Sequence, residues 1–118
     1  EKVRLLTFHA AKGLEFPVVF IAGAEEGITP LGGSHGEGPA ADPEEERRLF
    51  YVAVTRAMDE LYVSYCAHRL VYGKKVAAKP SRYISDIPVE CLESVAASPA
   101  RSRQSRGAKR GTSQLPLF

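Results

Sequence analysis

The sequence of 118 residues is poor in cysteine and histidine and has no long hydrophobic run. Its two cysteines, Cys66 and Cys91, show no C-x-x-C spacing, so we expect neither a disulfide framework nor a thiolate metal site. His35 and His68 show no ligand spacing to a partner. No apolar stretch approaches the roughly 18–20 residues that cross a membrane, and no leader of the secretory kind is visible. We therefore expect a protein of a reducing cytosol with no metal and no membrane partner.

Charge is divided unevenly along the chain. The formal net charge is +2, yet residues 1–93 carry 11 basic and 14 acidic residues, and the rest carries five basic residues and no acidic one. Residues 94–113 are mostly small or basic and offer little to bury. We predict one folded unit over 1–93, a disordered basic tail over 94–118, and a second stretch of low order over the glycine- and proline-rich residues 27–43.

The folded part is predicted to be α/β. Two short apolar runs, residues 3–7 and 17–22, are rich in β-branched residues and are typical of strands covered on both faces in a parallel sheet. Residues 60–66 alternate apolar and polar side chains and predict a further strand. With a short helix or turn over residues 80–87, the order of elements indicates one part of an open α/β sheet.

A helix is predicted from residue 43 to about residue 57. Asp42 can cap its N-terminus, Pro43 suits the first helical position, and Glu45 stands three residues after the cap. The helix carries a wide apolar surface, which predicts packing against a sheet. Arg56 is then expected to project from near the end of a buried helix.

Polar side chains are dense in residues 7–16, which follow the first predicted strand. Ligands of open α/β sheets bind at the carboxyl ends of strands, where we expect this segment to lie. A lone histidine such as His9, however, is more often a structural imidazole, and Lys12 and Glu15 can form a simple surface ion pair. Spacing alone leaves both interpretations open.

Arg56 allows two interpretations. A guanidinium beside small residues at a helix end can bind phosphate oxygens bidentately. Alternatively, Arg56 can pair with a nearby carboxylate such as Asp59. The acidic run 44–46 could suggest a metal site, but its place at the predicted helix start favours a solvated first turn that matches the helix dipole.

Two long stretches resemble motifs of the UvrD/PcrA/Rep-type superfamily 1 ATP-dependent DNA helicases. Residues 5–30 (LLTFHAAKGLEFPVVFIAGAEEGITP) resemble motif V and its continuation, and residues 44–65 (EEERRLFYVAVTRAMDELYVSY) resemble motif VI. Residues 80–88 (PSRYISDIP) are similar to the end of the second motor domain. The resemblance implies an α/β fold, namely the C-terminal portion of a RecA-like motor domain of the P-loop NTPase type with a mostly parallel sheet.

The resemblance also implies roles for single residues. Thr7 and His9 correspond to residues that contact single-stranded DNA, and Glu15 corresponds to a carboxylate near the nucleotide ribose. Arg56 corresponds to the arginine finger that reaches the ATP γ-phosphate, where a guanidinium stabilises charge that develops on the phosphoryl oxygens. Such an enzyme couples ATP hydrolysis to translocation on single strands and to 3′–5′ unwinding, because the finger acts only when two motor domains close.

The sequence departs from the family in one small and one large respect. Thr29 precedes Pro30 where an aromatic residue is more usual, and no G-x-x-x-x-G-K-[ST] phosphate loop or acidic Mg²⁺-binding motif occurs. Because the chain also opens on Glu1 rather than Met, we expect a piece of a longer protein. The resemblance implies a bacterial protein of the cytoplasm and nucleoid. The implied cofactor is ATP with Mg²⁺, held mostly by a missing N-terminal motor domain. The implied DNA partners are single strands and duplex junctions, and the 118 residues alone are expected to be inactive.

The C-terminus carries a second resemblance. Residues 114–118 (QLPLF) resemble the peptide by which bacterial replication and repair proteins dock on the β sliding clamp. Gln114 would fill a small polar pocket, and Leu115, Leu117 and Phe118 would enter an apolar cleft. The alternative is an accidental apolar terminus that packs back on the folded part.

Two other functions compete with a helicase segment. The chain could be a stand-alone domain that binds DNA or a sliding clamp without catalysis. A helicase–nuclease relative is less consistent with the sequence, because the chain shows no carboxylate cluster of the kind a nuclease needs. The basic tail could also bind RNA polymerase or repair proteins, and the sequence does not distinguish replication from repair.

Overall fold

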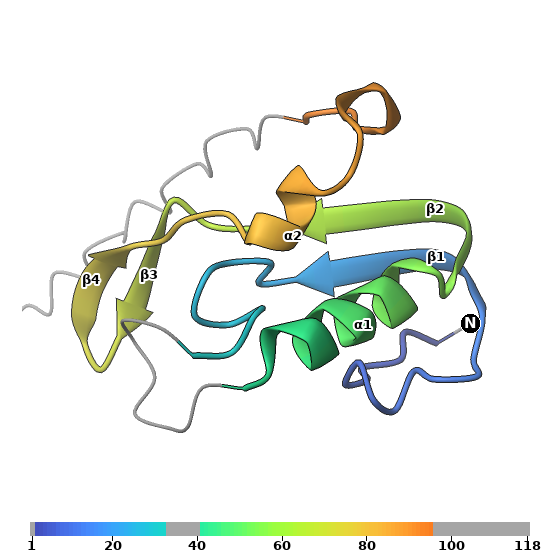
Figure 1. Cartoon of the computed structure of the whole chain (residues 1–118), viewed down its shortest axis with the longest axis horizontal. Coiled ribbons are helices and arrows are strands. Elements are labelled where there is room, and N and C mark those ends of the chain that lie inside the picture. The colour runs from blue at the N-terminus through green and yellow to red at the C-terminus, as the bar shows by residue number, and fades with distance from the viewer. Residues whose placement is uncertain (1, 33–40, 96–118) are drawn as a thin grey trace, which may run out of the picture.

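A computed structural model describes residues 2–32 and 41–95 (Figure 1). Apart from residues 94 and 95, the predicted tail, with Gln114, Leu115, Leu117 and Phe118, lies outside the described residues, so the boundary at residues 93 and 94 remains a prediction. Helices and strands are mixed, which confirms the α/β class. The elements are β1 (Phe16–Ala22), α1 (Pro43–Val54), β2 (Ala57–Ser64), β3 (His68–Val71), β4 (Lys74–Ala77), α2 (Arg82–Ser85) and a 3₁₀ turn (Val89–Cys91).

Strands β1 and β2 pair in parallel, and α1 connects them and packs on one face of the pair (Figure 1). Alternate residues of β1 point to opposite faces, so Ile21 is buried against α1 while Phe20 is exposed and stacks on Tyr62. The core on the α1 side consists of Ile21, Ala24, Phe50, Ala53 and Tyr83. Two of the predicted strands and the helix between them are therefore confirmed.

Helix α1 begins as predicted and ends earlier. Asp42 Oδ1 accepts a hydrogen bond from the Glu44 amide at 3.0 Å, which satisfies one free N–H of the first turn. The helix stops at Val54 rather than near residue 57, because Ala57 already pairs with Phe16 in the sheet. The described helices include none that is long and apolar enough to cross a bilayer.

The antiparallel hairpin of β3 and β4 is absent from the sequence-based prediction. Its two-residue turn consists of Tyr72 and Gly73, both in the left-handed region with φ of 48° and 76°. Such turns match the twist of the flanking strands, and glycine adopts this backbone without strain. In Figure 1 the hairpin and α2 lie beyond the carboxyl ends of β1 and β2. The predicted helix or turn over residues 80–87 is confirmed as α2.

The predicted strand over residues 3–7 is wrong. These residues are irregular, and the side chains of Val3 and Leu5 are 93% and 94% exposed. A strand needs a neighbour for its backbone hydrogen bonds, and no described segment pairs with residues 3–7. An apolar composition alone therefore does not make this segment a strand here.

Candidate functional site

Residues 7–15 form a compact turn that leads into β1. The Thr7 hydroxyl oxygen accepts a hydrogen bond from the Ala10 amide at 3.1 Å, and the Thr7 carbonyl accepts one from the Ala11 amide at 3.1 Å. Gly13 has a φ of 81°, which allows the chain to reverse towards the strand. The turn lies at the amino end of β1, so the expectation that it lies at a carboxyl end is wrong, since no strand precedes it.

Arg56 follows α1 and is held against this turn. Its Nη1 donates to the Leu14 carbonyl at 3.1 Å, and its Nε donates to the Val52 carbonyl at 3.0 Å. Its Nη2 donates to the Thr55 hydroxyl at 3.1 Å, and its own carbonyl accepts from the Phe16 amide at 2.9 Å. The guanidinium is thus fixed between the end of the helix and the start of β1.

All of these acceptors are neutral. Within residues 2–32 and 41–95 the ion pairs are Arg47 with Asp86, Arg69 with Glu25 and Arg82 with Glu26. The predicted alternatives, a pair of Arg56 with Asp59 and a pair of Lys12 with Glu15, are therefore not formed in the described part of the chain. No described carboxylate therefore pairs with the Arg56 guanidinium.

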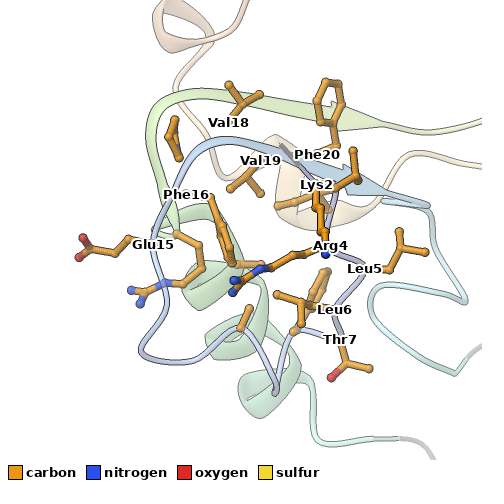
Figure 2. A pocket seen from close by; sticks show the side chains of 17 residues that line it. Lys2, Arg4, Leu5, Leu6, Thr7, Glu15, Phe16, Val18, Val19 and Phe20 are labelled. Atoms are coloured by element: carbon orange, nitrogen blue, oxygen red, sulfur yellow. The ribbon is translucent and has the colours of Figure 1, made fainter.

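An open pocket of about 940 Å³ lies between residues 2–8, β1 and the end of α1 (Figure 2). Three of the predicted site residues, Thr7, Glu15 and Arg56, line it, whereas His9 does not. Glu15 lies at the rim and points away in Figure 2. The charged lining residues are Lys2, Arg4, Glu15 and Arg56. Because three of the four are basic, the pocket favours an anionic ligand.

The carboxyl ends of β1 and β2 lead into a different cluster, which the sequence did not predict. The Glu25 side chain is almost fully buried and accepts hydrogen bonds from Arg69 Nε and Nη2 and from the Cys66 amide, each at 2.8 Å. These bonds, above all those from Arg69, lower the pKa of Glu25 to about 2, against the opposing effect of burial. Every oxygen of Glu25 is satisfied within the fold.

Glu26 forms a second ion pair beside the first. It accepts from Arg82 Nη2 at 2.7 Å and from the Arg82 amide at 2.6 Å, and these bonds lower its pKa. The partners lie more than 40 residues apart in sequence, so spacing gives no signal for them. The only available signal was the two-residue turn with Gly73, which would have revealed the hairpin that carries Arg69.

Both cysteines are free and exposed, and the Cys66 sulfur accepts a long contact from Arg69 Nη2 at 3.7 Å. In the described ranges no three His, Cys, Asp or Glu side chains gather where they could hold a metal ion.

Comparison with known proteins identifies the family. Residues 1–68 match the model of the UvrD-like helicase C-terminal domain. The chain is 49% identical over 112 residues to DNA helicase II of Escherichia coli strain K12, covering 95% of this chain and 15% of that protein. It is 48% identical over 101 residues to the ATP-dependent DNA helicase PcrA of Leuconostoc citreum, covering 86% of this chain and 13% of that protein.

A further relative is the ATP-dependent DNA helicase PcrA of Staphylococcus aureus strain MRSA252, 41% identical over 116 residues, with 95% of this chain and 16% of that protein covered. The chain therefore spans about a seventh of the length of these curated relatives. The family-model match alone covers more than half of the chain. On these matches, the chain belongs to the family of UvrD-like helicase C-terminal domains.

Proposed function

We propose that this chain is the C-terminal part of the second RecA-like motor domain of an ATP-dependent 3′–5′ DNA helicase. In this role it supplies Arg56 as the arginine finger and part of the DNA cleft, and the enzyme couples ATP hydrolysis to movement on single-stranded DNA. The relatives are named as DNA helicases, which supports the activity at the level of the family.

The main support for the proposal is that Arg56 lies at the pocket without a paired carboxylate. Its guanidinium lies at an open pocket whose charged lining residues are mostly basic and, among the described residues, it donates hydrogen bonds only to neutral acceptors. A charge held in this way can stabilise the phosphoryl oxygens of a nucleotide delivered from another domain, because no carboxylate has to be displaced.

The fold supports a place in a larger domain. The β1–α1–β2 unit is a parallel crossover, the building block of doubly wound sheets, and parallel sheets are normally covered on both faces. Here Val18 and Phe20 on the face opposite α1 are exposed, as are Val3 and Leu5 in the N-terminal segment. The missing N-terminal motor domain and the remainder of this one would cover these side chains.

The other site residues have more specific roles in this proposal. Thr7 and His9 contact single-stranded DNA, and Glu15 lies near the nucleotide ribose. The basic residues Lys2, Arg4 and Arg56 of the pocket would attract the phosphates of ATP. The described residues bring together no set of Mg²⁺ ligands, so the metal would be held mainly by the first motor domain.

The test is a chimeric helicase in which this chain replaces the matching region of the E. coli relative. We expect DNA-stimulated ATP turnover and 3′–5′ unwinding by the chimera, and no unwinding by a control that lacks the inserted region. A folded chimera that binds single-stranded DNA without turnover would favour the alternative, a non-catalytic domain that binds DNA. The isolated 118 residues, assayed beside it and freed of contaminating ATPase, are expected to show no turnover.

We also propose that Gln114, Leu115, Leu117 and Phe118 bind the β sliding clamp, with the basic tail as a tether near DNA. Support comes from the sequence QLPLF, which lies outside the described residues. A fluorescent peptide of residues 94–118 titrated with purified clamp should bind with micromolar affinity, and the variant Gln114→Ala with Phe118→Ala should not. No binding at about 100 µM would show that the match of QLPLF to the clamp-binding peptide is accidental.

A further inference from the structure

We propose that Thr55 is the positioning residue of Arg56: its hydroxyl sets the orientation of the guanidinium that faces the phosphate site. This inference rests on the proposed function, because it assigns a role within the same site.

The Thr55 hydroxyl links the guanidinium to the helix end. It donates to the Val52 carbonyl at 2.9 Å, and its oxygen accepts from Arg56 Nη2 at 3.1 Å. Since the hydrogen of the hydroxyl is already donated to Val52, the oxygen accepts from Arg56 through a lone pair. The hydroxyl therefore offers Arg56 an acceptor of fixed direction rather than a freely rotating group.

The same bonds fix the plane of the guanidinium. Nε is bound to Val52, Nη1 to Leu14 and Nη2 to Thr55, so one donor of each nitrogen is oriented by a different acceptor. A guanidinium has five N–H groups in a rigid fork, which leaves two free for phosphate oxygens. The Thr55 bond is the one of the three that comes from a side chain, and a single substitution can remove it.

Loss of this hydroxyl should leave the fold intact. The Val52 carbonyl also accepts from Arg56 Nε, so it keeps a partner when the hydroxyl is removed. Thr55 is exposed. At the end of α1 its backbone amide donates to the Tyr51 carbonyl at 3.0 Å, and this bond does not involve the side chain. The substitution Thr55→Val keeps the branched shape and that amide while deleting the acceptor of Nη2.

The experiment measures steady-state ATP turnover in the full-length helicase that carries this chain, or in the chimeric helicase described above. Thr55→Val should lower kcat about tenfold, because a misplaced group loses stabilisation of the transition state, with little change in KM for ATP. Thr55→Ser, which restores the hydroxyl, should recover kcat. Tyr51→Phe removes an exposed hydroxyl one turn earlier on the same helix and serves as the matched control.

A second readout is independent of turnover. In the isolated chain, NMR should show slow rotation of the Arg56 guanidinium about its Nε–Cζ bond, and Thr55→Val should accelerate it while Thr55→Ser should not. Equal kcat in Thr55→Val and the parent, or equal loss in the Val and Ser variants, would overturn the positioning role. Unchanged turnover in Arg56→Ala would instead refute the proposed function itself, so the two failures are distinguishable.

Discussion

Arg56 and Arg69 lie at opposite ends of the same parallel strand pair, and their surroundings differ in kind. Arg69 is bound bidentately to the buried carboxylate of Glu25, whose charge it neutralises. Arg56 is also held by three hydrogen bonds, yet its described acceptors are two carbonyls and a hydroxyl. An arginine that is fixed without a counter-charge is available to an anionic ligand, whereas a paired arginine stabilises the fold.

Helix α1 links two regions. The closed region contains the Glu25–Arg69 and Glu26–Arg82 pairs, and the open region is the pocket beside Arg56. The first residues of the helix belong to the closed region, since the Tyr83 hydroxyl donates to the Pro43 carbonyl at 2.8 Å and Arg47 pairs with Asp86 at 2.9 Å. Its last turn carries Arg56 to the open pocket. Contacts in the closed region therefore hold the start of α1, whose other end leads to Arg56. We expect substitutions in the closed region to change stability and substitutions at Arg56 to change ATP turnover.

The largest effect on stability is expected at Glu25. Glu25→Gln leaves Arg69 without its counter-charge and replaces one of the two accepting oxygens with an NH2 group that cannot accept a hydrogen bond. We expect the free energy of unfolding to fall by about 2 kcal/mol, reduced from the full cost of a buried pair because Arg69 is partly exposed. Chemical denaturation of the chain measures this. Glu15→Gln, at the exposed carboxylate of the open region, is the matched control, and equal losses in the two variants would remove the distinction between the regions.

The same pair predicts a dependence of stability on pH. Because the pKa of Glu25 in the folded chain is lowered from 4.5 to about 2, its stabilisation is complete above about pH 4.5 and is lost as the pH falls towards 2. The difference in thermal midpoint between the parent chain and Glu25→Gln should therefore shrink over that interval. A difference that stays constant from neutral pH to pH 2 would contradict the assigned pairing.

A smaller effect is expected where α1 begins. Asp42→Ala removes the side-chain cap of the Glu44 amide and should lower the free energy of unfolding by about 1 kcal/mol. Asp42→Asn keeps a capping oxygen and should retain most of the stability. If both variants lose the same amount, the negative charge at the helix dipole rather than the cap is the stabilising feature.

The smallest effect is expected at the exposed pair of Arg47 and Asp86. Both side chains are about half exposed, at 53% and 46%, so solvent screens their attraction. Arg47→Ala should change the free energy of unfolding by less than about 0.5 kcal/mol in denaturant titrations. A loss comparable to that of Glu25→Gln would show that exposed pairs matter as much as the buried one.

Much of the fold could be predicted from the sequence because the signals are local. The apolar run that became β1 and the Asp42–Pro43 start of α1 need only neighbouring residues to be recognised. The strand over residues 3–7 was wrong because a strand also needs a partner, which composition does not reveal. The end of α1 was placed too late because the pairing of Ala57 with Phe16, a distant contact, stops the helix.

For the candidate site, the sequence located residues but not the contacts that hold them, and the roles of these residues remain predictions. Thr7, Glu15 and Arg56 do line one pocket, but the acceptors that hold Arg56 include the Leu14 carbonyl, 42 positions away. The pairing of Glu25 with Arg69 spans 44 positions and depends on a hairpin whose only local sign is its glycine turn. Which charged residues are neutralised within the fold is therefore decided by tertiary contacts that spacing does not encode.

The most direct test of the central claim compares Arg56→Ala with Arg69→Ala in the chimeric helicase, measuring kcat for ATP in the presence of single-stranded DNA and the thermal midpoint of each variant. If Arg56 acts as the arginine finger, Arg56→Ala lowers kcat by about 10³-fold, and its thermal midpoint stays near that of the parent. Arg69→Ala lowers the midpoint and leaves the turnover of the folded enzyme near that of the parent. Parental turnover in Arg56→Ala would contradict the role of Arg56 as the arginine finger.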